Sequence, residues 1–171
     1  MAELRDIYDI DRQLTGRTAI RGINSEGELY LIVHVCIFNS KGQMLIQQRQ
    51  NCKSWAGYWD VSVGGCAVAG ETSRDAAHRE LLEEIGLDVD FTGRRPHFTH
   101  NFEKGFDDFY LLNMEPRLAD LRLQPEEVSA VRWAGADEIL AMIDGGKFIP
   151  YFKSVVQMMF DVRHKLDCFN L

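Results

Sequence analysis

The spacing of apolar residues along the chain predicts a series of strands. A near-continuous apolar run from residue 28 to residue 38 indicates a strand that is buried on both faces. The polar turn at residues 39–42 follows it and predicts a hairpin with the next apolar segment. Strands are expected at residues 28–38, 44–49, 59–63 and 128–133, and a strand pair at 88–100 and 106–114 around a turn at 101–105.

Three other segments show helical spacing. The first begins with a capping-box pattern of Thr72 and Asp75 and ends at Gly86, which suits the left-handed residue beyond a helix. Shorter helices are expected at residues 136–143 and from 150 to about 165. Strands flanked by helices in this order predict an α/β fold, and an α/β/α sandwich is the simplest arrangement. The first helix has a core stripe at i, i+4 and i+8, formed by Ala77, Leu81 and Ile85.

Composition fits a single domain over residues 1–171, because 46% hydrophobic and 26% charged residues are ordinary values for a globular chain. Residues 1–27 form an N-terminal extension with turn signals at 15–17 and 24–27. The formal net charge of −7 argues against a nucleic-acid polymer or an acidic membrane as partner. No apolar run approaches the roughly 20 residues that span a bilayer, and no signal peptide is recognisable. We therefore expect a cytoplasmic protein without a membrane partner.

The segment from Gly65 to Leu87 indicates a metal site. It reads Gly65, five residues, Glu71, seven residues, Arg79-Glu80-Leu81, one residue, Glu83-Glu84, one residue, Gly86-Leu87. Glu80, Glu83 and Glu84 stand at i, i+3 and i+4, so they share one helix face. Like charges this close repel unless a divalent cation lies among them. Hard oxygen ligands suit Mg²⁺, with Mn²⁺ as the alternative ion.

This spacing matches the signature of the Nudix (MutT-like) hydrolases at every fixed position, and the segment resembles that family's Nudix box. The resemblance implies an α/β/α sandwich with a mixed β-sheet. It also implies that the glutamates bind the metal together with the main-chain carbonyl of Gly65, and that Arg79 pairs with Glu71 to hold them in position. The residues to which it gives catalytic roles are Glu80, Glu83, Glu84, Arg79 and Glu71.

The flanks of the box resemble a narrower subgroup, related to isopentenyl-diphosphate isomerase. The residues that carry this likeness are the runs 38–45, 48–49 and 54–62, together with 6–9 and 14–17. The isomerase pattern has its catalytic cysteine where this chain has Gly64, and metal-binding histidines where it has Cys66, Ile23 and Tyr30. Isomerisation is therefore the alternative function. The intact Arg-Glu-x-x-Glu-Glu run, residues 79–84, favours hydrolysis.

Several other residues have more than one interpretation. Arg49 ends a predicted strand and is the expected contact to a substrate phosphate. Cys66 is better explained as a small buried thiol than as a nucleophile, and His34 as a core or cleft-wall residue than as a metal ligand. His97 and His100 lack ligand spacing and are expected at the surface. The four scattered cysteines, Cys36, Cys52, Cys66 and Cys168, are expected to be reduced thiols.

Two groups of residues stay open at this stage. Aromatic side chains could stack on a substrate or pack in the core: Trp55, Tyr58, Trp59, Phe102 and Phe106. An additional acidic base could come from Glu103, Asp107, Asp108, Glu126 or Glu127.

The sequence thus predicts a divalent-metal-dependent hydrolase of a diphosphate linkage in a small molecule, with a nucleoside diphosphate derivative as the favoured substrate class. A non-catalytic nucleotide-binding module is a further alternative, against which the retained carboxylates argue. The chain is expected to act as a monomer or a homodimer. The substrate itself stays open, because specificity lies in segments outside the box.

Overall fold

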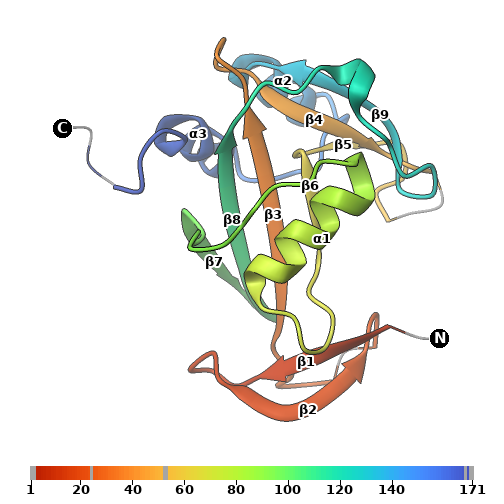
Figure 1. Cartoon of the computed structure of the whole chain (residues 1–171), viewed down its shortest axis with the longest axis vertical. Coiled ribbons are helices and arrows are strands. Elements are labelled where there is room, and N and C mark those ends of the chain that lie inside the picture. The colour runs from red at the N-terminus through yellow and green to blue at the C-terminus, as the bar shows by residue number, and fades with distance from the viewer. Residues whose placement is uncertain (1–2, 24, 52–53, 168, 170–171) are drawn as a thin grey trace.

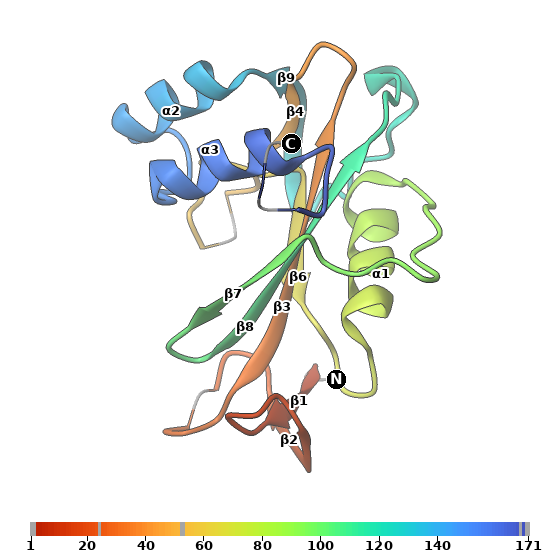
Figure 2. The same cartoon turned by 90° about the vertical axis from the view of Figure 1, so that its left-hand side faces the viewer.

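The computed structural model describes residues 3–23, 25–51, 54–167 and 169. A central β-sheet lies between two helical layers, with α1 on one face and α2 and α3 on the other (Figure 1 and Figure 2). This is the α/β/α sandwich expected from the sequence. In chain order the elements are β1 (Leu4–Tyr8), β2 (Leu14–Ile20), β3 (Tyr30–Phe38), β4 (Met44–Arg49), β5 (Trp59–Asp60), β6 (Val63–Cys66), α1 (Ser73–Ile85), β7 (Phe98–Phe102), β8 (Gly105–Asn113), a 3-10 turn η1 (Leu118–Asp120), β9 (Val128–Ala134), α2 (Ala136–Asp144) and α3 (Lys153–Val162).

The main sheet has seven strands and is mixed. Its central order is β5-β4-β3-β8-β7, while β6 pairs with β3 and β9 pairs with β4. Strands β3 and β8 run parallel, from Tyr30 opposite Gly105 to Phe38 opposite Asn113. A parallel pair needs a long crossover, and here the crossover carries α1 across one face of the sheet. The mixed sheet implied by the family resemblance is therefore confirmed.

Strand β3 reads as a continuous apolar run because it is buried on both faces, as its alternating side chains contribute to two different cores. The core beneath α1 includes Val33, Val35, Ala77, Leu81 and Ile85. The core beneath α2 and α3 includes Cys36, Phe38, Ile139, Met159 and Phe160.

The strand expected at residues 59–63 is instead two short strands, β5 and β6, with a bend at Ser62. The Ser62 hydroxyl donates to the carbonyl of Leu45 at 2.6 Å and accepts from the amide of Ile37 at 2.8 Å. It bridges β3 and β4 where they separate, since these strands pair only at Phe38 and Met44. The expected hairpin is therefore limited to that pair, and the bend turns β6 toward α1.

Three other boundaries differ from the sequence-based expectation. The strand expected at 88–100 begins only at Phe98, because a turn forms first, with the Arg94 amide 3.0 Å from the Phe91 carbonyl, and Pro96 has no amide to donate. The following turn joins β7 to β8 between residues 102 and 105. Helix α3 covers residues 153–162 and is shorter than the expected 150–165.

The N-terminal extension contains a β-hairpin formed by β1 and β2, and we call residues 3–23 the N-terminal hairpin. The turn predicted at residues 15–17 is wrong, because these residues lie within β2. The pairing register shifts there, and Gly16 takes a φ of 76° that glycine adopts without strain. Of the turn predicted at 24–27, Asn24 lies outside the described residues, while residues 26 and 27 form a turn.

Contacts with two distant segments fix the N-terminal hairpin to the main domain. The backbone amides of residues 69 and 70 donate to the Leu4 carbonyl at 2.8 Å and to the Asp6 carboxylate at 2.7 Å. Arg12 forms an ion pair with the fully buried Asp108, and its Nη1 donates to Oδ1 at 3.0 Å. A two-stranded hairpin is marginal on its own, so these contacts account for its fixed position.

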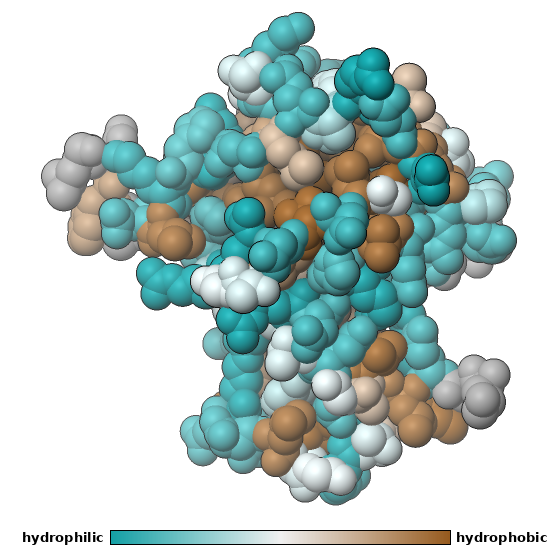
Figure 3. Space-filling model, viewed as in Figure 1, coloured by the Kyte–Doolittle hydropathy of each residue, from teal (hydrophilic) through white to brown (hydrophobic). Residues whose placement is uncertain are grey.

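The outer strand of this hairpin remains exposed. Leu14 is 62% exposed and Ile20 is 42% exposed. Apolar surface is visible at the lower end of the molecule, where the hairpin lies (Figure 3). Among the described residues, no helix is long and apolar enough to cross a membrane.

Two of the four cysteines can be assessed. Cys36 and Cys66 are buried free thiols, as expected. Cys52 and Cys168 lie outside the described residues.

Candidate active site

Helix α1 carries the box glutamates and is fixed at both ends. The Thr72 hydroxyl accepts from the Asp75 amide at 3.3 Å, and the Asp75 carboxylate accepts from the Thr72 amide at 2.9 Å. This is the capping box expected from the sequence. Gly86 ends the helix in the left-handed conformation, with a φ of 73°. The helix therefore has a defined start and end, which sets the direction of its side chains.

The three glutamates differ in burial. Glu80 is 6% exposed and Glu84 is 2% exposed, because both lie on the flank next to the core stripe. Glu83 points outward, and its side chain is about half exposed. Two of the three carboxylates are thus held out of solvent, where an unbalanced negative charge is costly.

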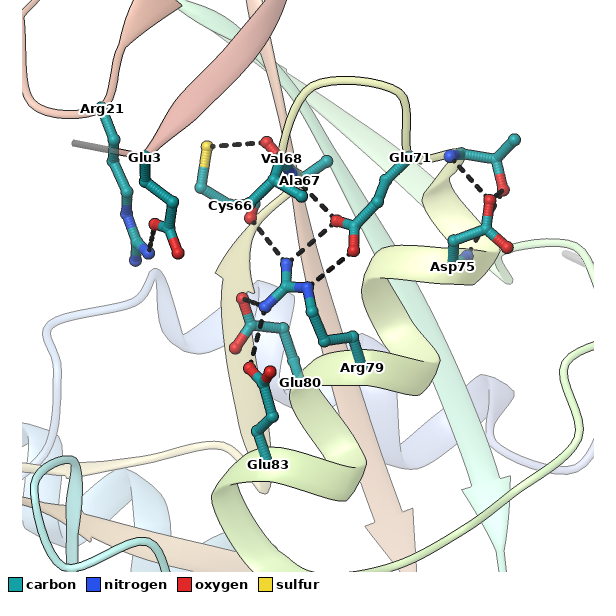
Figure 4. A network of polar contacts seen from close by, with 11 residues as sticks. Glu3, Arg21, Cys66, Ala67, Val68, Glu71, Asp75, Arg79, Glu80 and Glu83 are labelled. Carbon is teal, nitrogen blue, oxygen red and sulfur yellow. Dashed lines mark hydrogen bonds and ion pairs between the residues drawn. The ribbon is translucent and has the colours of Figure 1, made fainter. Parts of the chain in front are cut away.

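Arg79 makes five contacts with its five N–H groups (Figure 4). Its Nε and Nη2 donate to the two carboxylate oxygens of Glu71 at 2.7 and 3.0 Å. Nη2 also donates to the carbonyl of Cys66 at 3.1 Å. Nη1 lies 2.9 Å from Oε1 of Glu80 and donates to Glu83 at 3.1 Å. One guanidinium therefore joins the end of β6, the loop before α1 and two box glutamates.

Gly65 leaves room for a carboxylate. A Cβ at this position would lie 2.0 Å from Oε1 of Glu80, so any side chain there would displace the glutamate. The Gly65 backbone and the Glu80 carboxylate consequently lie against each other at the junction of β6 and α1.

Glu84 is held from the other side by the sheet. Gln47 of β4 is also buried, and its Nε2 donates to Oε2 of Glu84 at 2.9 Å. Burial, reinforced by the negative charge of Glu80, raises the pKa of Glu84 to about 8 despite this hydrogen bond. Burial also raises the pKa of Glu80, and the charge of Arg79 opposes that effect.

These residues fit a divalent cation. Oε1 of Gln47 is buried and accepts no hydrogen bond from the residues that the structure describes, and the buried Oε1 of Glu80 has an ion-pair contact with Nη1 of Arg79. Adjacent carboxylates with raised pKa values are groups that a hard cation would stabilise in the charged form. Across the described ranges, no group of three His, Cys, Asp or Glu side chains is arranged so that it could hold a metal ion. Glu83 and Glu84 instead contact Arg79 and Gln47.

A cleft of about 530 Å³ opens beside Gly65. Residues of the N-terminal hairpin form one end, β3 and β6 form the floor, and the segments around residues 54 and 150 form the other end. Another cleft, of about 550 Å³, lies on the outer side of α1 around His78 and Asp88. The box glutamates line neither cleft, but Gly65, against which Glu80 lies, lines the first. The side chains that matter below for the first cleft are Arg5, Arg21, Tyr30, His34, Arg49 and Tyr151.

A chain of hydrogen bonds runs along the floor of this cleft. Nδ1 of His34 lies 2.7 Å from Asp107, and its Nε2 lies 3.2 Å from the hydroxyl of Tyr151. That hydroxyl donates to Asp60 at 2.8 Å, and the other oxygen of Asp60 accepts from Arg49 at 3.2 Å. Burial alone would lower the pKa of His34, but the charge and hydrogen bond of Asp107 outweigh it and raise the pKa. The chain ends on Arg49 and fixes its guanidinium at the cleft wall.

The structure brings together most of the residues singled out in the sequence. Gly65, Glu71, Arg79, Glu80 and Glu84 form one cluster, with Glu83 at its outer edge, and Arg49 lines the adjacent cleft. Their catalytic and binding roles stay predictions.

The residues left open in the sequence fall on different sides of the fold. Trp55 lines the cleft, Phe106 is buried in the core, and Phe102 packs edge-on against Tyr30 at 5.5 Å between ring centroids. Among the acidic candidates, Asp107 contacts His34 on the cleft floor, whereas Asp108 pairs with Arg12. Glu103 and Glu126 are exposed, and Glu127 is half-buried.

The histidines and Cys66 can be placed as well. His34 is a cleft-wall residue, as expected. His100 is exposed, but His97 is only half-exposed, since its Nδ1 accepts from the Leu111 amide at 3.1 Å. Burial raises the pKa of the Cys66 thiol, although Arg21 and Arg5 oppose this. A thiol with a raised pKa is a poor nucleophile.

Five residues that contact the box glutamates or line the cleft were not predicted from the sequence. Gln47, Asp60 and Tyr151 come from separate elements and meet only in the folded chain. Arg5 and Arg21 belong to the N-terminal extension. The residues show no mutual spacing in the sequence that could have identified them.

The carboxylate helix, its arginine fork and the β-sheet beneath it have the arrangement that the resemblance to the Nudix hydrolases implies. The family profile of the NUDIX domain matches residues 29–152, and the chain belongs to the Nudix family. It is 49% identical over 149 residues to an uncharacterized Nudix hydrolase of Listeria monocytogenes, which covers 86% of this chain and 88% of that protein. The chain is therefore an enzyme of the Nudix hydrolase class.

Two further likenesses concern the subgroup and the fold. The chain is 31% identical over 143 residues to an isopentenyl-diphosphate Delta-isomerase of Pectobacterium atrosepticum, covering 78% of this chain and 76% of that protein. A crystal structure from Deinococcus radiodurans superposes with a TM-score of 0.76 at 24% identity, covering 91% of this chain and 98% of that one. The second likeness concerns the fold alone.

Proposed function

We propose that this Nudix hydrolase cleaves a diphosphate linkage in a small molecule, with nucleoside diphosphate derivatives as the substrate class. It requires Mg²⁺, for which Mn²⁺ can substitute. The observation that carries the proposal is the placement of two buried carboxylates, Glu80 and Glu84, on one helix face beside the open backbone of Gly65. Without a cation, Glu84 binds a proton near neutral pH, because burial and Glu80 raise its pKa to about 8.

The residues of the site have separate roles in metal binding and proton transfer. The carbonyl of Gly65 and the carboxylates of Glu80, Glu83 and Glu84 would hold the cation. When bound, the cation neutralises charge on the phosphates and lowers the pKa of a coordinated water. A carboxylate that does not bind the cation would accept the proton of the attacking water.

Arg79 and Glu71 orient the carboxylates. The bidentate pairing with Glu71 fixes the guanidinium plane, and the remaining N–H groups position Glu80 and Glu83. Arg49 binds a substrate phosphate. Its side chain is already fixed by Asp60 and by the carbonyl of Ser54 at 2.9 Å, so little conformational entropy is lost when the phosphate binds.

Isomerisation is disfavoured by the shape of the site. A Cβ at Gly64, where the isomerase pattern has its cysteine, would lie 2.5 Å from Cδ2 of His34. The imidazole thus takes up the space of that cysteine. Ile23 and Tyr30 stand where the isomerase pattern has metal-binding histidines, and neither side chain is a metal ligand of that kind. The retained box carboxylates argue in the same way against a non-catalytic nucleotide-binding module.

The domain extent, localisation, oligomeric state and partners of the protein stay proposals. We take residues 1–171 as one domain, located in the cytoplasm and acting as a monomer or homodimer. The partner is a small-molecule diphosphate. The net charge of −7 disfavours nucleic-acid polymers and acidic membranes.

The proposal is tested by a hydrolysis screen with Mg²⁺ across nucleoside di- and triphosphates, dinucleotides, nucleotide sugars and prenyl diphosphates. We expect metal-dependent release of phosphate or nucleotide from at least one nucleotide class. In parallel, isopentenyl diphosphate is incubated with the enzyme in heavy water. Deuterium uptake, with no hydrolysis in the screen, would contradict the proposal and indicate that the enzyme is an isomerase.

A further inference from the structure

The cleft contains two arginines besides Arg49. We propose that Arg5 and Arg21, at the end of the cleft formed by the N-terminal hairpin, bind the terminal, unsubstituted phosphate of the substrate. The inference rests on the proposed function and narrows its substrate class. It favours nucleoside di- or triphosphates and other diphosphate monoesters over dinucleotides and nucleotide sugars.

Both arginines lie in the cleft that the proposed metal site borders. Arg5 and Arg21 line the same cleft as Gly65 and Cys66. Gly65, whose carbonyl would hold the cation, therefore shares this cleft with both arginines, and a neighbouring phosphate of the same substrate would lie in the same cleft.

The protein already orients Arg5 and leaves Arg21 partly exposed. Arg5 is only 3% exposed, its Nη2 donates to the carbonyl of Ile23 at 3.0 Å, and its guanidinium lies 3.8 Å from the ring centroid of Tyr30. A guanidinium in such a cation–π contact keeps a fixed orientation. Arg21 pairs with Glu3 at 2.5 Å (Figure 4), and both side chains are nearly half exposed. Such exposed pairs are weak, so a phosphate can compete for Arg21.

The number of oxygens and charges distinguishes a terminal phosphate from one that is esterified on both sides. A terminal phosphate offers three non-bridging oxygens and close to two negative charges, whereas a phosphate esterified on both sides offers two oxygens and one charge. Two guanidinium groups at one end of the cleft match the first kind better, since guanidinium groups form charge-assisted hydrogen bonds with phosphate oxygens. At the other end of the cleft, Arg49 stands with the rings of Trp55 and Tyr151. That end suits the remainder of a nucleotide, which carries a planar base.

The binding test uses Arg21→Gln, with Arg17→Gln as the matched control. Arg17 also belongs to the N-terminal hairpin and pairs with one glutamate, Glu28, at 2.6 Å, but it does not line the cleft. Imidodiphosphate, which has unsubstituted phosphates and resists hydrolysis, is titrated calorimetrically in the presence of Mg²⁺. We expect its Kd to rise about tenfold or more in Arg21→Gln and to stay within about twofold in Arg17→Gln. Melting temperatures confirm that both variants are folded.

The selectivity test compares a nucleoside diphosphate with the nucleotide sugar of the same base. Arg21→Gln is expected to lower kcat/KM for the nucleoside diphosphate at least about fivefold more than for the nucleotide sugar. Equal losses on both substrates, or wild-type affinity of Arg21→Gln for imidodiphosphate, would overturn the inference. So would the absence of imidodiphosphate binding by the wild type. Arg21-dependent binding without hydrolysis of any substrate would retain the subsite and refute the proposed function.

Discussion

The buried amide of Gln47 donates a hydrogen bond of 2.9 Å to Oε2 of the buried Glu84, joining β4 to α1 on the side of the helix that carries the box glutamates. This bond holds the carboxylate in place but does not offset the cost of its burial, because the pKa of Glu84 is still raised to about 8. The metal-free enzyme therefore contains an acid that favours its protonated form near neutral pH.

The first prediction concerns stability and pH. Burial and Glu80 raise the pKa of Glu84 from 4.5 to about 8, so between these values the folded state binds a proton that the unfolded state lacks. The free energy of unfolding of the metal-free protein should then fall as pH rises through this window, by an amount on the order of 2–4 kcal/mol. Glu84→Gln removes this component. Urea denaturation in chelator at about pH 5 and pH 8 measures both proteins, and identical pH dependence of the two would contradict the prediction.

The second prediction concerns Arg79→Lys. Lysine keeps the charge but cannot reproduce the planar fork that contacts Glu71, Glu80 and Glu83. We expect kcat/KM to fall roughly 10- to 100-fold and half-maximal activity to require more Mg²⁺. Arg74→Lys, on an exposed position of the same helix, is the control and should change neither quantity. An unchanged Mg²⁺ requirement in Arg79→Lys would argue against an orienting role.

The third prediction concerns Tyr151→Phe. The substitution removes the hydroxyl that joins His34 to Asp60 and thereby loosens Arg49. We expect KM to rise about fivefold with little change in kcat, the effect of one lost hydrogen bond on ground-state binding. Tyr110→Phe is the matched control, because it also removes one hydroxyl contact, to Ser73 at 2.9 Å, away from the cleft.

A double-mutant cycle decides whether Tyr151 acts through Arg49. Adding Arg49→Lys to Tyr151→Phe should raise KM less than the two single effects combined. Fully additive effects would show that the hydroxyl acts independently of Arg49.

The fourth prediction concerns the attachment of the N-terminal hairpin. Arg12→Gln leaves the fully buried carboxylate of Asp108 without its ion-pair partner. We expect a loss of about 2–3 kcal/mol in the free energy of unfolding, somewhat less than for a completely buried pair because the Arg12 side chain is 36% exposed. Arg117→Gln, in an exposed pair with Asp120, should change it by less than about 0.5 kcal/mol. Equal effects of the two substitutions would contradict the buried-pair explanation.

The parts of the site that could be predicted from the sequence are local. Glu80, Glu83 and Glu84 follow helical spacing, and Arg79 reaches Glu71 only eight residues away. Such contacts are determined by one helix and the loop before it, so the order of the residues is enough to place them together.

The parts that could not be predicted depend on which strands become neighbours. His34 and Asp107 are 73 positions apart and meet because β3 lies beside β8. Tyr151 and Asp60 are 91 positions apart, and Arg12 and Asp108 are 96 apart. No local pattern specifies such pairs, because strand order is set by the packing of the whole sheet.

The fold shows the same division. Strands with strong apolar patterns, such as β3 and β9, were predicted close to their observed bounds. Residues 88–97 were not, because Val89 and Phe91 pack against the core without belonging to a strand. An apolar pattern in the sequence indicates which residues are buried, and buried residues need not belong to a strand.

The most direct test of the central claim is hydrolysis of the best substrate as a function of Mg²⁺ concentration, for the wild type, Glu83→Gln and Glu84→Gln. We expect Mg²⁺-dependent hydrolysis by the wild type and none by either variant, with both variants folded by circular dichroism. Wild-type rates in both variants would contradict the assignment of the box carboxylates to a metal site.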